Sequence, residues 1–152
     1  MSILCDWEIK ALSLGNQLIE PFVDHVVREE NNRKILSYGL GSYGYDIRLS
    51  PKECLLFGGT SAGVCDPKSF DRSILKETEL REDEKGEYFL LPPYGYCLCV
   101  AHERLVLPED VTVLPAGKSS YARTGIHCNI TPAEGGWEGY LTLQINNATG
   151  LF

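Results

Sequence analysis

The chain has 152 residues, of which 43% are hydrophobic, and it carries a net charge of −7 at neutral pH. This length allows one domain with a substantial hydrophobic core, so we expect a single domain over residues 1–152. The negative charge argues against a broad nucleic-acid-binding surface but is compatible with a small basic pocket for one nucleotide. No run approaches the roughly 18 apolar residues that cross a membrane. The N-terminus also lacks a signal-peptide pattern, so a cytoplasmic location is expected.

The predicted elements are one short helix followed by short strands. Asp6 is expected to be the N-cap of a helix over residues 7–12, which ends near Gly15. Apolar runs bounded by Gly, Pro, Asp and Asn then predict strands at residues 45–49, 53–57, 88–91, 96–101, 104–107, 111–114, 127–131 and 140–146. Residues 119–124 are expected to form one helical turn, and the charge-rich residues 68–87 a solvated loop or excursion. This pattern favours a mainly β fold, either a barrel or a jelly roll.

The six cysteines are Cys5, Cys54, Cys65, Cys97, Cys99 and Cys128. In a cytoplasmic chain reduced thiols are expected rather than disulfides. Cys97 and Cys99 are two residues apart in an apolar strand and therefore share a face. Zinc ligands usually include a Cys-x-x-Cys pair, which this sequence lacks, so no zinc site is predicted. The thiols are interpreted as buried small hydrophobic groups.

Three tyrosines separated by glycines, Tyr38, Tyr43 and Tyr45, form a candidate stacking surface for single-stranded nucleic acid. The net charge of −7 argues against that function. The simpler interpretation is the start of a strand in which glycines relieve crowding, with Asp46 and Arg48 as a structural pair.

The stretch AGKSSYARTGIHCNITPAEGGWEG, residues 116–139, carries the clearest functional pattern. Lys118, the hydroxyls of Ser119 and Ser120, and Arg123 lie within seven residues of one another beside a glycine. Such a turn is suited to holding phosphate oxygens. The alternative to phosphate binding is an ordinary polar loop. In that interpretation the serines cap the turn and Arg123 forms a local salt bridge.

The segments GKSSYAR (117–123), NITP (129–132) and WEG (137–139) together resemble the metal-independent dCTP deaminases. The same resemblance extends to the upstream segments LCD (4–6), IEPF (19–22), SYGLGSYGYDIR (37–48) and DPKSF (66–70). It runs in order from about residue 3 to the last residue. The resemblance implies a distorted jelly roll or barrel of the dUTPase-like type, assembled as a homotrimer with sites between subunits.

Deamination of cytosine requires water at C4 and a proton for the departing ammonia. Zinc deaminases use a His-x-Glu and Pro-Cys-x-x-Cys signature, which is absent here, so any deamination must proceed without catalytic zinc. The resembling family uses a Glu on the strand after the WEG turn as general base and acid, and that position here is Gln144. An amide cannot accept water's proton. Gln144 is therefore either a natural loss of the catalytic Glu or an engineered Glu→Gln change. In both cases the simplest structural interpretation is a strand glutamine whose hydrogen bonds are satisfied.

The resemblance implies roles for the other residues. Ser119 and the backbone carbonyl near Pro132 orient the attacking water. Lys118 and Ser120 meet the triphosphate. Arg123 lies near the reacting centre and is often supplied by a neighbouring subunit.

The remaining implied features concern the sugar, the metal and regulation. Glu134 lies close to the sugar and phosphates, with a salt bridge within the loop as its alternative. Mg²⁺ arrives bound to the triphosphate rather than in a protein-only cage. dTTP is a possible inhibitor. Trp137 is expected to pack against the protein rather than to stack on a base.

These features leave three functional hypotheses. The first is hydrolytic deamination of dCTP to dUTP and ammonia in pyrimidine deoxynucleotide biosynthesis. The second is a dUTP pyrophosphatase or bifunctional relative, which needs an Asp to activate water at the α-phosphate, and none follows the Ser-Ser turn. The third is a catalytically silent nucleotide-binding homologue, favoured by Gln144 and by the early end of the chain. Since family members continue with further strands and a tail, we expect the family's C-terminal segment to be lacking.

Overall fold

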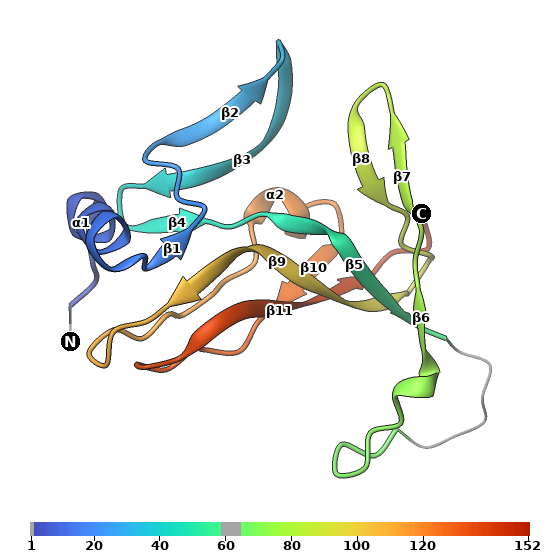
Figure 1. Cartoon of the computed structure of the whole chain (residues 1–152). Helices are drawn as coiled ribbons and strands as arrows, with labels where there is room; N and C mark the ends of the chain where they lie inside the picture. The colour runs from blue at the N-terminus through green and yellow to red at the C-terminus, as the bar shows by residue number, and fades with distance from the viewer. Residues whose placement is uncertain (1, 59–64) are drawn as a thin grey trace.

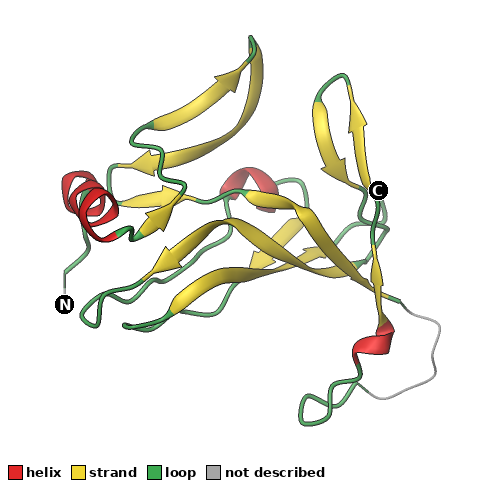
Figure 2. Cartoon of the chain, viewed as in Figure 1, coloured by secondary structure: helices red, strands yellow, loops and turns green. Residues whose placement is uncertain are grey.

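The computed structural model describes residues 2–58 and 65–152 (Figure 1). The fold is mainly β with a short N-terminal helix, as predicted (Figure 2). The elements are α1 (Asp6–Asn16), β1 (Ile19–Glu20), β2 (Val26–Glu30), β3 (Arg33–Gly41), β4 (Gly44–Asp46), β5 (Leu49–Phe57), the 3₁₀ helix η1 (Arg72–Ile74), β6 (Leu75–Glu77), β7 (Leu80–Asp83), β8 (Gly86–Phe89), β9 (Tyr96–Val106), α2 (Ser119–Ala122), β10 (Ile126–Asn129) and β11 (Glu138–Asn147).

The largest sheet has the strand order β10-β11-β9-β5-β6, and β1 pairs with β9 outside that path. Strands β2, β3 and β4 form a second sheet, and β7 and β8 form a hairpin that projects from the body (Figure 1). Buried apolar side chains from α1 and from several strands of the first two sheets form the core; they include Ile9, Ile19, Leu40, Ala101 and Leu143. Among the described residues, no helix is long and apolar enough to cross a membrane.

Helix α1 begins one residue earlier than predicted, because Cys5 rather than Asp6 is the N-cap. The Glu8 carboxylate accepts a hydrogen bond from the Cys5 backbone N–H at 2.9 Å, and this bond lowers the pKa of Glu8. Asp6 is instead the first helical residue, where its negative charge faces the positive end of the helix. The helix also runs past Gly15 and ends where Gln17 adopts a left-handed conformation with φ of 56°.

The two strands predicted at residues 96–101 and 104–107 are one strand, β9. The prediction divided the strand because polar residues at 102–104 interrupt the apolar run. The alternation of buried and exposed positions nevertheless continues through them, because Glu103 is buried beside an arginine partner. A buried ion pair thus keeps the strand regular where its sequence is polar.

Most other predicted strands are present with shifted ends. The strand predicted at residues 45–49 is divided between the end of β4 and the start of β5, and the one at 88–91 corresponds to β8. The predictions at 53–57, 127–131 and 140–146 match β5, β10 and β11. The predicted strand at 111–114 makes only an isolated bridge, between Val113 and Ala133.

Sequence reasoning did not predict the β2–β3 hairpin, because β2 and the first residues of β3 are charged and largely exposed and the tip projects from the body (Figure 1). A strand with little buried surface has no apolar alternation to reveal it. The available signal is the pair Asn31 and Asn32, whose φ angles of 51° and 60° are those of a two-residue hairpin turn.

Residues 68–87 are largely regular structure rather than a loop, and the part that forms β7 and β8 is an excursion from the body (Figure 1). Asp71 caps η1 by accepting a hydrogen bond from the Ser73 backbone at 2.9 Å, and β6 then pairs with β5. Strands β7 and β8 pair with each other from Leu80 to Phe89. Backbone ladders form these strands, and ladder bonds do not require apolar side chains.

Gly39 is required where β3 pairs with β2. Its φ is +98°, and a Cβ atom there would lie 2.1 Å from the backbone oxygen of His25. We therefore expect Gly39→Ala to lower the free energy of unfolding by about 1–3 kcal/mol, from strain and lost pairing. Urea unfolding measures this change. Gly44→Ala on β4 is the matched control, because its Cβ would meet nothing within 4 Å, and an equal loss in both variants would contradict the prediction.

Candidate active site

Helix α2 is the helical turn predicted from the GKSSYAR segment, and it brings Ser119 and Arg123 together. Arg123 donates from Nε to the Ser119 carbonyl at 3.2 Å and from Nη2 to Ser119 Oγ at 3.3 Å. Both side chains belong to exposed residues. The hydroxyl of Ser119 does not cap the helix, because Lys118 is the N-cap and makes no side-chain capping bond. Ser119 Oγ and the guanidinium therefore form one exposed polar pair.

Asp46 of β4 anchors the start of this turn. Its carboxylate accepts a hydrogen bond from the Lys118 ammonium and a second from Ser37 Oγ, the latter at 3.3 Å. Gly117 lies against β10, where a Cβ would come within 3.0 Å of the Cys128 carbonyl oxygen. The turn that begins at Gly117 is thus held between β4 and β10. Sequence reasoning missed Asp46 as its partner.

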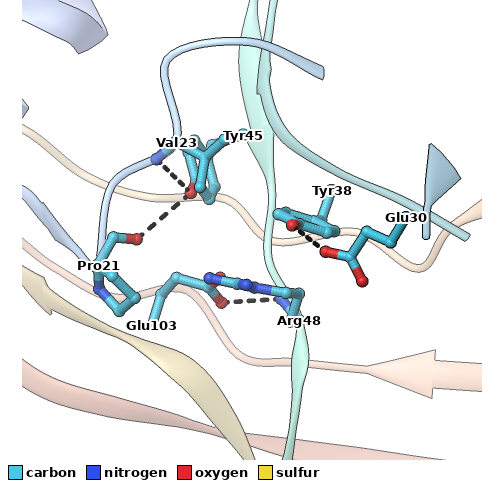
Figure 3. A network of polar contacts seen from close by, with 7 residues as sticks. All are labelled: Pro21, Val23, Glu30, Tyr38, Tyr45, Arg48 and Glu103. Atoms are coloured by element: carbon cyan, nitrogen blue, oxygen red, sulfur yellow. Dashed lines mark hydrogen bonds and ion pairs between the residues drawn. The ribbon is translucent and has the colours of Figure 1, made fainter. Parts of the chain in front are cut away.

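The predicted pair of Asp46 and Arg48 is wrong, because Arg48 is paired with Glu103 of β9 (Figure 3). Arg48 Nε donates to Glu103 Oε1 at 2.7 Å, and the Arg48 backbone N–H donates to Oε2 at 2.8 Å. Glu103 has a fully buried side chain. The guanidinium also lies over the Tyr38 ring, 4.3 Å from its centroid. These contacts fix the link between β4 and β5, two residues after Asp46.

The three tyrosines do not form one stacking surface. The Tyr38 hydroxyl donates to Glu30, which raises the pKa of Tyr38 (Figure 3). The Tyr45 hydroxyl accepts from the Val23 backbone at 3.1 Å, and partial burial raises its pKa. Tyr43 is exposed in the turn between β3 and β4. The hydroxyls of Tyr38 and Tyr45 therefore form hydrogen bonds within the fold, whereas Tyr43 is exposed.

Gln144 lies on β11 directly opposite Asn129 of β10. Asn129 Nδ2 donates to Gln144 Oε1 at 2.9 Å. Leu141 and Leu143 are buried on the other side of the strand, so Gln144 and Thr142 point away from the core. Sequence reasoning missed Asn129 as the partner of Gln144. The available signal was that Asn129 lies in the predicted strand before β11, and consecutive strands often pair.

A hollow of about 520 Å³ opens on this face of β11. Gln144, Pro132, Glu134, Trp137 and Thr142 are among the residues that line it. This volume is in the range of small-ligand pockets. Glu134 is the one carboxylate among the described lining residues. Trp137 packs against the core cluster, as predicted, while also lining the hollow.

The predicted site residues therefore fall into two groups. Gln144, Pro132 and Glu134 surround the hollow, whereas Lys118, Ser119, Ser120 and Arg123 do not line it.

The two groups belong to opposite faces of the sheet. Cys128, against which the α2 turn rests, pairs with Ile145, and both pack on the core side. Partial burial raises the pKa values of the Cys128 thiol and of Tyr121 in α2. Gln144 is adjacent to Ile145 in the strand and therefore points the other way. Helix α2 lies on the side of the sheet that carries β4 (Figure 1). The hollow lies on the other side, so one chain alone does not bring the two groups together.

Comparison with known proteins identifies the family. A family model described as dCTP deaminase-like matches residues 3–151. A dCTP deaminase of Protochlamydia amoebophila is 44% identical over 151 residues, which cover 99% of this chain and 77% of that protein. Those of Acidovorax sp. and Herpetosiphon aurantiacus are 41% and 42% identical, again over 99% of this chain and over 77% and 76% of their own lengths. The chain therefore belongs to the dCTP deaminase-like family.

Proposed function

We propose that this chain has the fold and site of a dCTP deaminase, which converts dCTP and water to dUTP and ammonia in pyrimidine deoxynucleotide biosynthesis. The observation that carries the proposal is the hollow lined by Gln144, Pro132 and Glu134, in a chain whose relatives are dCTP deaminases. Gln144 occupies the position of the catalytic carboxylate. The proposal involves no catalytic zinc, because the sequence lacks the signature of zinc deaminases.

In this mechanism the attacking water is held by Ser119 Oγ and by a backbone carbonyl near Pro132. A carboxylate at position 144 takes the water's proton and returns it to the departing ammonia. Arg123 stabilises charge near the reacting carbon, and its bond to Ser119 Oγ supports a joint role for the two side chains. With Gln144 the proton has no acceptor, so the chain is expected to bind substrate and turn it over slowly or not at all.

The triphosphate is assigned to the start of α2. Lys118 and the Ser120 hydroxyl supply donors for phosphate oxygens, and Asp46 holds the Lys118 ammonium in place before substrate arrives. Mg²⁺ enters with the triphosphate and is held mainly by phosphate oxygens and water. Glu134, which is exposed beside the hollow, is assigned to the sugar and phosphate region.

We infer further that the active assembly is a homotrimer with sites between subunits. The support is the separation of the two groups on opposite faces of the sheet. A ring of identical subunits places the α2 face of one chain against the hollow of the next, so that each interface completes one site. dTTP, which shares the triphosphate, is proposed to compete at the same place. A cytoplasmic location belongs to the same proposal, since nucleotide pools and unpaired thiols suit a reducing cell interior.

Mixing two inactive variants tests whether sites form between subunits. The parent chain retains Arg123 but has Gln144, whereas the double variant Gln144→Glu/Arg123→Ala has the carboxylate but lacks the guanidinium. Each is expected to be inactive alone. In randomly mixed trimers about one quarter of the sites combine the carboxylate of one chain with Arg123 of its neighbour. We therefore expect about a quarter of the ammonia release of Gln144→Glu after the two chains are refolded together.

The control replaces the parent in that mixture with Arg123→Ala, which leaves every site without the guanidinium. No activity is expected in the control. Absence of activity in the parent mixture, although mixed trimers form, would place each site within one chain and contradict the proposal.

A catalytically silent nucleotide-binding function is the second candidate, and the Gln144 amide favours it. Product analysis separates the possibilities. A deaminase yields dUTP and ammonia, a pyrophosphatase yields dUMP and pyrophosphate from dUTP, and a bifunctional enzyme yields dUMP, pyrophosphate and ammonia from dCTP. A silent homologue binds dCTP without any product, even when position 144 is changed to a carboxylate.

A further inference from the structure

Three thiols converge in the core, on the face of the sheet opposite the one that carries Gln144 and the hollow. Cys54 lies on β5, and Cys97 and Cys99 lie on β9, where Cys54 and Cys99 are direct cross-strand partners. The Sγ atoms of Cys97 and Cys99 are 3.5 Å apart. The Sγ atoms of all three residues lie within 4.8 Å of one another. The strand register thus gathers side chains that are more than 40 residues apart in the sequence.

Hydrophobic packing alone does not explain this convergence. Cys54 and Cys97 are each 1% exposed and Cys99 is 4% exposed, which fits small apolar groups. Packing, however, requires only that each side chain meets some neighbour, and on the same face Leu143 and Ile145 of β11 are available to both β9 thiols. Here the sulfurs also meet one another. Three polarisable atoms directed to one point form a set of ligands for a soft ion.

The spacing of the sulfurs fits a metal centre. A metal–sulfur bond of about 2.3 Å places three sulfurs around a central ion roughly 4.0 Å apart. The distance of 3.5 Å and the upper limit of 4.8 Å lie on either side of that value, so small side-chain rotations suffice. Within the described residues, this group contains no histidine or carboxylate as a fourth ligand.

We propose that Cys54, Cys97 and Cys99 form a buried three-coordinate site for Cu(I). Thiolate ligands favour the soft ions Cu(I) and Zn(II) over harder cations. Structural zinc almost always takes four ligands, and in this closed core three are present. A monovalent ion that accepts three sulfurs matches the ligand set better. The site lies on the core side of β9, whereas Gln144 points to the opposite face of the sheet.

Thr78 connects the backbone of the cluster to the surface. Its backbone N–H donates to the Cys54 carbonyl at 2.8 Å. Thr78 also lines a surface hollow of about 340 Å³, together with Glu77 and Phe89. The adjacent strand β6 is the edge of the large sheet. Local opening of an edge strand admits an ion without unfolding the domain.

The test titrates the reduced full chain with Cu(I) without oxygen, using the coloured bathocuproine complex as both copper source and competitor. We expect one Cu(I) to be transferred per chain. Cys97→Ser and Cys54→Val are expected to weaken binding at least about 100-fold, because loss of a ligand exceeds the 10–100-fold cost of losing a supporting contact. Cys5→Ser and Cys65→Ser serve as matched controls outside the cluster and should bind like the parent.

X-ray absorption of the copper-loaded parent counts the sulfur ligands directly and does not depend on whether the core variants fold. Three sulfurs per copper support the site, and two sulfurs or mixed oxygen ligands overturn it. Copper binding that persists in a folded Cys97→Ser variant, or disappears in Cys65→Ser, also overturns it. Zn(II) binding that resists displacement by Cu(I) would refute the assignment to a monovalent ion.

Discussion

Gln144→Glu is expected to turn a chain with little or no deaminase activity into one that releases ammonia from dCTP. A positioned general base contributes about 10²–10⁴-fold to rate, so we expect a rise of that size over the parent. Asn129 Nδ2 donates to Gln144 Oε1, and a carboxylate oxygen can accept the same bond without any change in shape. The substitution therefore adds a proton acceptor to an existing geometry. Quantifying dUTP and ammonia from dCTP with Mg²⁺ measures the change.

The matched control is Thr142→Glu. Thr142 lines the same hollow two residues away on the same face of β11, so the variant adds an equal charge at the wrong position. It should stay inactive. Equal activity in both variants would show that any carboxylate in the hollow suffices, against a specific role for position 144. dCTP binding without turnover in Gln144→Glu would instead favour the silent nucleotide-binding function.

Glu103→Ala is expected to cost more stability than any other single change considered for this chain. The Glu103 carboxylate has no exposed surface and accepts two hydrogen bonds from Arg48, one of them from its backbone. Removing one partner of a buried ion pair costs about 3–5 kcal/mol, because the charge of the other partner is left without an opposite charge. The free energy of unfolding from urea titration should fall by that amount. Arg48 should also lose its position over Tyr38.

Glu138→Ala provides the control for this loss. Glu138 pairs with Arg104 at the surface, where its side chain is 57% exposed, so the expected cost is below about 1 kcal/mol. The double variant Glu103→Leu/Arg48→Met should recover much of the lost stability, since apolar groups of similar size can replace a buried pair. A Glu103→Ala cost as small as that of Glu138→Ala would contradict an essential role for the buried pair.

Much of the candidate site is predictable because its residues act locally. The turn from Lys118 to Arg123 is a helical segment in which residues four apart are neighbours, as the Arg123–Ser119 contacts illustrate. The strand that carries Gln144 alternates between apolar and polar residues, because one face of β11 covers the core. In both segments a short repeat in the sequence indicates which residues share a face.

The sequence by itself determined the mainly β fold, the N-terminal helix, the family, and the positions of the turn and of Gln144. Only the tertiary structure decided which distant groups meet, because strand register and sheet packing set those pairings. It joined Arg48 to Glu103 rather than to Asp46, and it directed Asp46 to Lys118. It also placed α2 and the hollow on opposite faces of one sheet, since adjacent residues in a strand point in opposite directions.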